Sequence, residues 1–314
     1  MRIVFMGTPD FAVPCLEALL NAGYTVCGVV TQPDRPKGRK REMTPPPVKV
    51  IALANGIPVY QPESLKEQDA IEPIRAWQPD LIVTAAFGQI LPVELLQLPV
   101  NRCINVHASL LPKYRGGAPI QHSIIDGESE SGVTIMYMER GLDTGDMLAQ
   151  SKVEITEFDD NGTMHQKLSL CGAQLLLDML PKLLRGELHP VPQDHEKASY
   201  AKNISRADER INWNHTSSQI WNRVRGLHPW PIAFSMIQDE VFKIWQAEQI
   251  DDTSIEFSDV VPGTIIRCDE TGIVVRTGDG LISLKVIQPA GKKAMPASEY
   301  VRGRHVQPGT IFQN

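Results

Sequence analysis

The chain has 314 residues, which is long enough for two domains that each bury a core of their own. Its apolar content of 42% and charged content of 22% are ordinary for a globular protein, and its net charge is −6. A polyanionic partner must therefore meet local basic patches, because the overall field is negative. The five cysteines are widely spaced and form no CxxC pair, so we expect neither a disulfide framework nor a metal site.

The first residues, MRIVFMGTPDF, hold only a short apolar run before Gly7 and Pro9. We interpret that run as a first strand and not as a signal peptide or a membrane span. No later segment of the sequence approaches 18 uninterrupted apolar residues. The sequence therefore predicts a soluble, cytoplasmic protein, and the cysteine usage favours a reducing compartment.

Strand and helix patterns alternate through the first half of the chain. Strands are expected at 2–6, 25–31, 58–60, 81–86, 104–108 and 133–138, and helices at 11–21, 48–55, 69–77 and 164–184. This alternation predicts an α/β fold with a Rossmann-like, mostly parallel sheet that has helices on both faces. In such sheets, ligands bind at the carboxyl ends of the strands.

The pattern changes in the second half. A polar, proline-bearing stretch from 186 to 197 is typical of a linker, and a short helix is expected at 217–225. Short strands separated by Gly and Asp are expected at 241–246, 264–267, 273–276 and 281–287, which predicts a C-terminal OB-like β-barrel domain. We therefore expect a catalytic domain at 1–189, a linker at 190–206 and a barrel domain at 207–314.

The fingerprint of a dinucleotide site is missing. The first strand is followed by Gly7-Thr8-Pro9-Asp10 instead of GxGxxG, and no acidic residue ends the second strand. A nicotinamide or flavin enzyme is therefore a weak alternative, although the Gly7 turn still allows an anion at a helix N-terminus.

Two clusters of positive charge lie in this acidic chain. The segment 34–49, DRPKGRKREMTPPPVK, has six Lys or Arg against two acids, and its glycine and four prolines favour a loop. The second cluster lies in the expected barrel domain and consists of Lys285, Lys292, Lys293, Arg302 and Arg304, against Glu299. Either cluster alone is typical of a solvated surface, whereas the two together favour a nucleic-acid backbone as partner.

Asn105 and His107 lie one residue apart in a short apolar run that precedes a loop rich in Pro and Gly. Side chains alternate along a strand, so both should point to the same face. The spacing alone fits a satisfied buried pair as well as it fits a site. Asp143 lies in a glycine-bordered turn after the strand at 133–138, where it can reach a neighbouring histidine or act only as a turn former.

An amide, an imidazole and a carboxylate fit acyl-type transfer without a protein nucleophile. Asn105 and a protonated His107 would donate hydrogen bonds to an oxyanion, while Asp143 would orient the imidazole and help remove a proton from an attacking amine. No serine or cysteine has a nucleophile-elbow pattern, and we interpret Cys103 on the same face as a small apolar filler.

Three motifs resemble the signature of folate-dependent formyltransferases: NVHASLLP at 105–112, YRG at 114–116 and GLDTGD at 141–146. The resemblance is strongest to bacterial members that act on methionyl-tRNA, and it extends over GTPDF at 7–11, QPDRP at 32–36, PVK at 47–49, VRG at 224–226 and HPWP at 228–231. It implies transfer of a formyl group from 10-formyltetrahydrofolate to the methionine of initiator methionyl-tRNA, giving N-formylmethionyl-tRNA and tetrahydrofolate. No membrane and no obligate protein partner are implied.

The resemblance also implies roles for individual residues. The catalytic residues would be Asn105, His107 and Asp143. The residues expected to contact the folate are Phe87, Gly88, Ile90, Leu91, Ser109, Leu110, Leu111 and Pro112. Those expected to contact tRNA are Arg35, Lys37, Arg39, Lys40, Arg41, Lys292, Lys293, Arg302 and Arg304, with Arg39 the nearest counterpart of the family's key arginine.

Two alternatives stay open at this point. Formyltransferases that act on glycinamide ribonucleotide or on amino sugars share the catalytic signature, so a small amine such as a nucleotide-linked amino sugar is a second acceptor class. An RNA-binding protein with a vestigial α/β domain is the non-enzymatic interpretation, and the intact Asn105, His107 and Asp143 disfavour it. The basic segment and the β-rich C-terminal region favour tRNA over a small amine.

Overall fold

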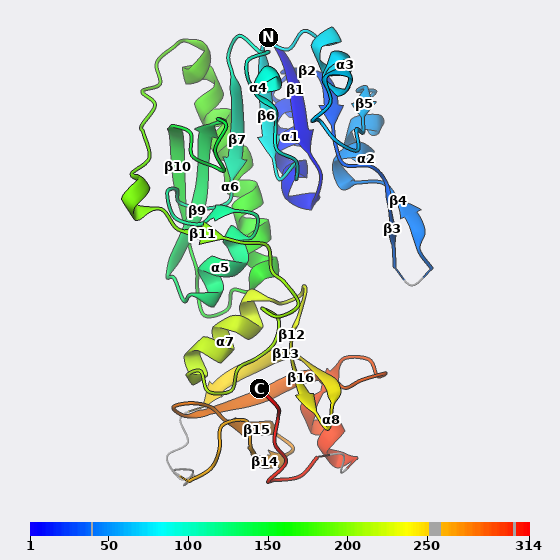
Figure 1. Ribbon diagram of the computed structural model, residues 1–314, viewed down its shortest axis with the longest axis vertical. Helices are drawn as coiled ribbons and strands as arrows, with labels where there is room; N and C mark the ends of the chain where they lie inside the picture. The colour runs from blue at the N-terminus through cyan, green and yellow to red at the C-terminus, as the bar shows by residue number, and fades with distance from the viewer. Residues whose placement is uncertain (39, 251–258, 304–305) are drawn as a thin grey trace. The chain divides into compact units, whose positions relative to one another are not determined.

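The computed structural model describes residues 1–38, 40–250, 259–303 and 306–314. The chain divides into two compact units (Figure 1). Unit 1 comprises Met1–Pro119, Glu130–Glu154 and His165–Lys202, and unit 2 comprises Ile120–Ser129, Ile155–Met164 and Asn203–Asn314. Each unit is therefore assembled from segments that are not contiguous in the sequence.

Unit 1 is built on a seven-stranded sheet with the order β10-β9-β7-β6-β1-β2-β5. Its strands are β1 (Arg2–Gly7), β2 (Thr25–Val30), β5 (Val59–Tyr60), β6 (Leu81–Ala85), β7 (Cys103–His107), β9 (Glu130–Tyr137) and β10 (Met147–Glu154). The pairings from β5 across to β7 are parallel, whereas β9 pairs antiparallel with both β7 and β10. The prediction of a mostly parallel sheet is confirmed, with the antiparallel pairings confined to one edge.

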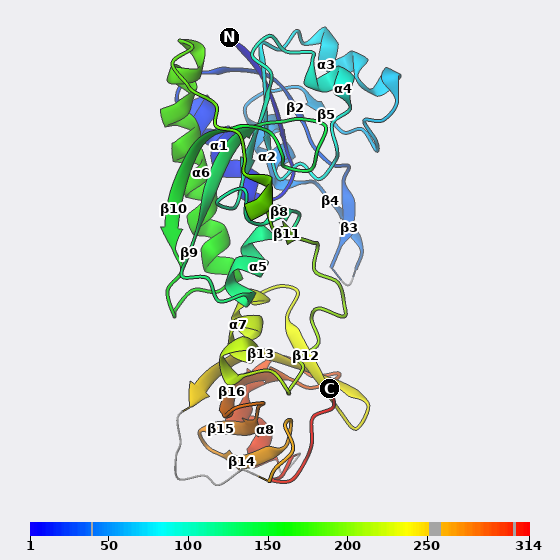
Figure 2. The ribbon, with the colours of Figure 1, turned by 60° about the vertical axis from the view of Figure 1, so that its left-hand side comes forward.

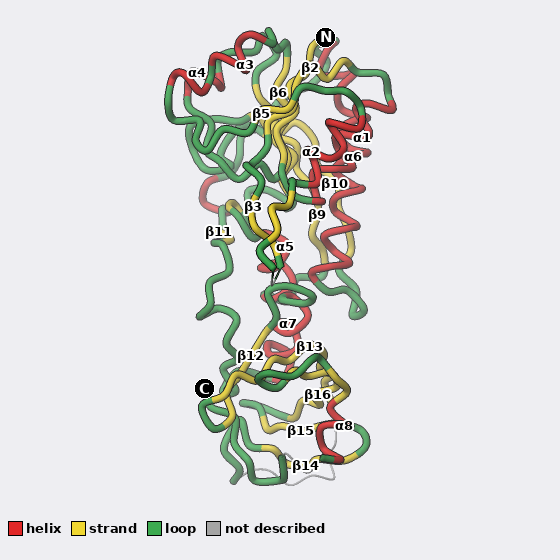
Figure 3. The backbone as a smooth tube through the Cα atoms, turned by 90° about the vertical axis from the view of Figure 1, so that its right-hand side faces the viewer, coloured by secondary structure: helices red, strands yellow, loops and turns green. Residues whose placement is uncertain are grey.

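Helices cover both faces of this sheet (Figure 3). One face carries α1 (Val13–Asn21), α2 (Pro47–Ala54) and most of α6 (Asn161–Leu184), and the other carries α3 (Glu72–Ala76) and α4 (Val93–Leu96). On the second face Met6 and Ile82 pack with Ile74 and Leu95 in one buried cluster. Burying such a side chain stabilises the fold by about 1.5–3 kcal/mol. Among the described residues, no helix has the length and hydropathy needed to cross a lipid bilayer.

Helix α6, with 24 residues, packs against the face of β7 to which Val106 points. A Cβ atom on Gly172 would lie 2.8 Å from Cγ1 of Val106, so glycine is what lets the helix approach the strand this closely. The Ser169 hydroxyl donates to the carbonyl oxygen of Phe11 at 2.7 Å, which ties the helix to the segment after β1. Because Val106 faces α6, its neighbours Asn105 and His107 face the opposite side of the sheet.

Unit 2 contains an antiparallel sheet with the order β12-β13-β16-β15-β14, and β17 pairs with β16. Its strands are β12 (Ala233–Ile237), β13 (Glu240–Ile250), β14 (Ile265–Asp269), β15 (Gly272–Arg276), β16 (Leu281–Gln288) and β17 (Met295–Pro296). Two helices accompany them, α7 (Ser217–Gly226) and α8 (Ala297–Arg302). The rings of Trp213, Phe242 and Phe312 meet in the core. The prediction of a C-terminal antiparallel β-domain is confirmed.

The last residues close this sheet into a barrel. The backbone N–H of Gln313 donates to the carbonyl of Met236 in β12 at 2.9 Å, and that of Phe312 donates to the carbonyl of Gly263, just before β14, at 2.8 Å. Two isolated bridges record the same pairings. The terminal segment thus joins the two edge strands, and closure removes the exposed edges that an open sheet would present.

Some elements differ from the sequence prediction. The basic segment, predicted as a loop, contains an antiparallel hairpin of β3 (Arg35–Lys37) and β4 (Glu42–Thr44), which projects from unit 1 (Figures 1 and 2). The sequence patterns also do not predict β10, β12 or α5 (Pro119–Ile125). The predicted helix at 69–77 is a 3-10 turn at Gln68–Ala70 followed by the shorter α3, and further 3-10 turns lie at Asp10–Ala12 and His195–Lys197.

Candidate active site

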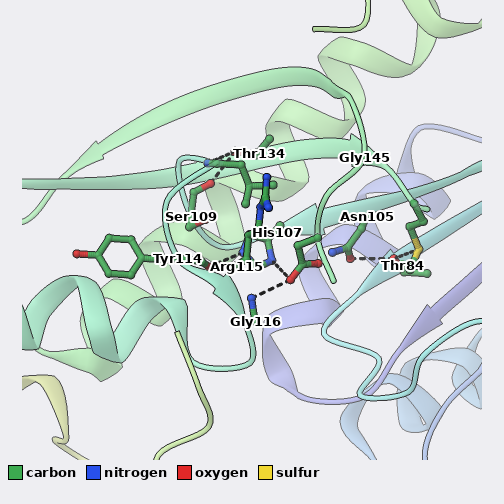
Figure 4. Close-up of polar contacts among 12 residues, drawn as sticks. Thr84, Asn105, His107, Ser109, Tyr114, Arg115, Gly116, Thr134 and Gly145 are labelled. Atoms are coloured by element: carbon green, nitrogen blue, oxygen red, sulfur yellow. Dashed lines mark hydrogen bonds and ion pairs between the residues drawn. The ribbon is translucent and has the colours of Figure 1, made fainter. Parts of the chain in front are cut away.

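Strand β7 carries the polar pair at its C-terminal end, between the parallel neighbour β6 and the antiparallel neighbour β9. Asn105 is half-buried, and its Oδ1 accepts a hydrogen bond from the Thr84 hydroxyl of β6 at 2.8 Å. The amide oxygen therefore faces Thr84, and the Nδ2 group points away from it. Figure 4 shows the Nδ2 group on the side of His107, so the two donors of the amide face the same space as the imidazole.

His107 is buried, with 6% of its surface exposed, and both of its ring nitrogens have defined neighbours. Nε2 lies 2.9 Å from the carbonyl oxygen of Tyr114, and Nδ1 lies 3.7 Å from Oδ2 of Asp143. A carbonyl oxygen can only accept, so Nε2 carries a proton. The nitrogen that gains or loses a proton is therefore Nδ1, on the side of the carboxylate.

Asp143 lies in the turn between β9 and β10. Its backbone has a φ of +51°, in the left-handed region that Asp and Asn adopt more readily than most residues. Its Oδ2 accepts a hydrogen bond from the N–H of Gly116 at 2.9 Å. The structure thus brings together Asn105, His107 and Asp143, which the sequence places on two separate segments.

These three side chains can stabilise a developing oxyanion and accept a proton without forming a covalent intermediate. The amide of Asn105 supplies fixed donors, Nδ1 of His107 donates when protonated, and Asp143 balances the resulting charge. The thiol of Cys103 lies two residues before Asn105, and burial raises its pKa to about 12. At neutral pH this group is an uncharged thiol, as expected of an apolar filler.

The loop after β7, where the folate contacts are predicted, is tied down by its own hydrogen bonds. The Ser109 hydroxyl donates to the carbonyl of Lys113 at 2.7 Å, and the Thr134 hydroxyl donates to the carbonyl of Ser109 at 2.7 Å. The N–H of Leu111 donates to the oxygen of Thr134 at 3.1 Å. Leu111 is buried, whereas Leu110 and Pro112 are partly exposed. Ser109 therefore shapes this loop with its hydroxyl.

The other predicted folate contacts follow β6, at the same edge of the sheet. Phe87 and Leu91 are buried in the core cluster on the α3 and α4 face, so their side chains serve packing. Ile90 is 79% exposed, and Gly88 has a φ of +84° with an open backbone. The exposed members of this segment are thus Gly88 and Ile90, and these two are available to a ligand.

The predicted tRNA contacts fall into two groups, one in each unit. In the hairpin, Arg35, Lys37, Lys40 and Arg41 are exposed, and Arg35 pairs with Glu63 at 2.7 Å. Arg39 lies outside the described residues. In unit 2, Lys292, Lys293 and Arg302 are exposed, and Nζ of Lys292 lies 5.4 Å from the centre of the Tyr300 ring. Arg304 also lies outside the described residues.

Sequence reasoning missed the groups that hold the candidate catalytic side chains. Thr84 orients Asn105, the Tyr114 carbonyl orients His107, and Gly116 holds the carboxylate of Asp143. Gln193, in the stretch predicted as a linker, holds the backbone of the Asp143 turn. The YRG motif at 114–116 was a usable signal, because it supplies two of these hydrogen-bond partners.

Family models and known proteins match both the N-terminal and the C-terminal parts of the chain. A family model described as formyl transferase matches residues 1–180, and one described as formyl transferase, C-terminal domain, matches residues 203–305. Among solved structures, the sugar 3N-formyl transferase WlaRD, in the presence of dTDP and 5-N-formyl-THF, aligns with a TM-score of 0.67 and 21% identity over 93% of this chain and 99% of its own. That likeness establishes a common fold.

Curated relatives are more similar. Methionyl-tRNA formyltransferase of Bacillus velezensis is 52% identical over 99% of this chain and 97% of the relative. Methionyl-tRNA formyltransferase of Geobacillus thermodenitrificans is 56% identical over 96% of this chain and 94% of the relative. From this similarity along nearly the whole length of both chains, we conclude that the protein belongs to the methionyl-tRNA formyltransferase family.

Proposed function

We propose that this protein transfers the formyl group of 10-formyltetrahydrofolate to the amino group of methionine on initiator methionyl-tRNA, in the cytoplasm, at the Asn105, His107 and Asp143 site. The observation that carries the site assignment is the position of Nδ1 of His107, 3.7 Å from Oδ2 of Asp143 and on the same strand face as Asn105. The products are N-formylmethionyl-tRNA for translation initiation and tetrahydrofolate.

The amine nitrogen attacks the formyl carbon, and the carbonyl oxygen becomes an oxyanion. Asn105 donates to that oxygen from Nδ2, and His107 donates from Nδ1, since Nε2 is held by the Tyr114 carbonyl. The bond from the formyl carbon to N10 then breaks, N10 takes up one proton, and the attacking nitrogen gives up one. Asp143 stabilises the imidazolium and assists the loss of the amine proton. One such donor is worth about 10²–10³ in rate, or roughly 3–4 kcal/mol.

The donor would lie at the ends of β6 and β7, against the loop at 109–112 and the exposed Gly88 and Ile90. The hydrogen-bonded loop favours this placement, because a rigid, partly apolar wall can hold a pterin ring without reorganising. The tRNA would meet the hairpin through Arg35, Lys37, Arg39, Lys40 and Arg41, and unit 2 through Lys292, Lys293, Arg302 and Arg304. The four described hairpin cations are exposed, as a phosphate-binding surface requires.

The test is formyl transfer from 10-formyltetrahydrofolate to three acceptors: initiator methionyl-tRNA, elongator methionyl-tRNA and a nucleotide-linked amino sugar. We expect formylation of the initiator species alone. In the same assay His107→Ala and Asp143→Asn should lose at least 100-fold in rate while their thermal unfolding stays close to wild type. A variant that keeps more than a tenth of the wild-type rate would disprove the role of that residue, and turnover of the sugar alone would replace tRNA as acceptor.

A further inference from the structure

Gln193 is a buried residue that contacts the Asp143 turn directly. Only 5% of its surface is exposed. Its Nε2 donates two hydrogen bonds, one to the carbonyl of Asp143 and one to the carbonyl of Gly145, each at 2.8 Å. A side-chain amide has two donor hydrogens, so both are used on this turn.

Arg115 fixes Gln193 from the other side. It is 2% exposed, and its Nε and Nη2 donate to Oε1 of Gln193 at 3.1 and 2.8 Å. Its Nη1 and Nη2 each lie 3.3 Å from Nδ1 of His195, which accepts because arginine has only donors. The two-pronged contact with Arg115 decides the orientation of the Gln193 amide, since the amine end would meet another donor.

The Asp143 turn needs such support. Asp143 has a left-handed backbone at φ +51°, which costs free energy in any residue with a Cβ. At Gly145 a Cβ would collide with the Tyr137 carbonyl, so the chain passes close to the end of β9. Gly116, next to Arg115, holds the carboxylate while Arg115 holds the backbone through Gln193. The adjacent residues Arg115 and Gly116 therefore hold both the backbone and the carboxylate of Asp143, the first through Gln193 and the second directly.

We propose that Gln193 is a positioning residue for formyl transfer: it holds the 143–145 turn so that the Asp143 carboxylate faces Nδ1 of His107. The residue does not touch the reacting atoms and acts through Asp143, so the inference rests on the proposed role of Asp143. A misplacement of about 1 Å can cost roughly 100-fold in rate. Losing Gln193 should therefore lower kcat and leave both KM values unchanged, because neither the hairpin nor the folate loop is touched.

The test compares the kcat and the KM of each substrate for Gln193→Leu and Gln193→Glu with those of wild type. Leucine removes every hydrogen bond of the amide. Glutamate keeps the acceptor for Arg115 but loses the two donors to the turn. It is therefore the variant to measure if Gln193→Leu does not fold. We expect kcat to fall about 10- to 100-fold in both variants, with each KM within about twofold of wild type. A kcat within twofold of wild type in the folded variants would overturn the proposal.

A double-mutant cycle separates positioning from general weakening. If Gln193 acts through Asp143, the Asp143→Asn, Gln193→Glu double variant is no slower than Asp143→Asn alone in single-turnover assays. Multiplied losses would overturn the proposal. The matched control is Ser169→Ala, which removes one buried hydrogen bond of unit 1 away from the site and should lower the Tm but not kcat. If Asp143→Asn were fully active, the proposed role of Asp143 would fail first, and the two failures are thereby distinguished.

Discussion

At the scale of single residues, the Tyr114 carbonyl decides which nitrogen of His107 can take part in chemistry. The amide of Asn lies where Nδ1 of a histidine lies, whereas the amide of Gln reaches the position of Nε2. We therefore expect His107→Asn to keep a donor toward the substrate and to be about tenfold faster than His107→Gln, which would direct its amide to Tyr114. Single-turnover formylation of both variants measures this. A faster glutamine variant would place the reactive proton on Nε2, and equal rates would contradict the preference for Nδ1.

A second residue-scale prediction concerns stability at acid pH. Burial lowers the pKa of His165, with Asp10 acting in the opposite direction. At a pH between this lowered folded-state pKa and the unfolded-state pKa near 6.5, His165 is protonated in the unfolded chain but neutral in the folded chain. The stability present above about pH 6.5 is thus lost as pH falls through the folded pKa. His165→Phe keeps a ring against Phe11 and should lose less Tm than wild type between pH 7.5 and 5.5. Parallel Tm curves would contradict this.

The three proposed catalytic residues differ in how far the sequence predicts their positions. The shared face of Asn105 and His107 follows from strand alternation alone, and the turn at Asp143 follows from its glycines. The approach of Asp143 Oδ2 to within 3.7 Å of His107 Nδ1 depends on the pairing of β7 with β9, and residue spacing does not reveal that pairing. Gln193 gives no sequence signal, because a glutamine bonded to distant backbone carbonyls leaves no periodic or compositional pattern. It lies in a polar stretch, which composition alone assigns to a linker.

At the scale of elements, the base of the hairpin is clamped. Nζ of Lys49 pairs with Asp34 at 2.8 Å across the ends of the hairpin, and Gln61 donates to Asp34 at 2.8 Å. The hydrogen bonds from Gln61 and Lys49 lower the pKa of Asp34, so its carboxylate stays charged in mild acid. Lys49→Met should raise the KM for tRNA severalfold and leave kcat unchanged. The control Lys66→Met, at an exposed lysine, should leave both the KM and kcat unchanged. An unchanged KM would show that the clamp is dispensable.

The hairpin charges make a separate prediction. Replacing Lys37, Lys40 and Arg41 with Ala should weaken tRNA use and flatten the dependence of log KM on log salt, by about 0.7–0.9 for each phosphate that the hairpin no longer neutralises. The salt series on wild type and variant measures the slope. Lys66→Ala with Lys152→Ala, two exposed lysines elsewhere in unit 1, should leave it unchanged. A slope that is identical in all three proteins would make the hairpin ordinary surface.

The elements that the sequence misses are the weakly patterned ones. β3 and β4 are three residues each and carry exposed charges and a proline, so no apolar alternation marks them. β10 forms the edge of the sheet and is only partly buried along its length. The long apolar strands and α6 are recognisable because their buried faces demand a continuous run of apolar residues.

At the scale of the whole molecule, six segments alternate between the two units, so the chain passes between them five times. Separate segments of one unit depend on each other for hydrogen bonds. In unit 2, Nη1 of Arg225 donates to the carbonyls of Thr156 and Asp159 at 2.8 and 3.1 Å, and these two residues lie in a different segment from Arg225. A fragment of residues 1–189 would carry 120–129 and 155–164 without the rest of unit 2. We expect it to unfold without a cooperative transition, measured by circular dichroism. A sharp transition in the fragment would show that unit 1 folds alone.

The barrel closure of unit 2 has a practical consequence. The segment 310–313 is short, is held by backbone hydrogen bonds on both sides, and anchors Phe312, which is 1% exposed, in the core. A chain ending at residue 309 would present two strand edges with an empty aromatic slot between them, ready to pair with another chain. We expect it to self-associate in light scattering, and a free peptide of sequence TIFQN to suppress that association. The terminal segment could then be supplied as a separate peptide, and binding of a fluorescently labelled peptide to the truncated chain would report on folding of the barrel.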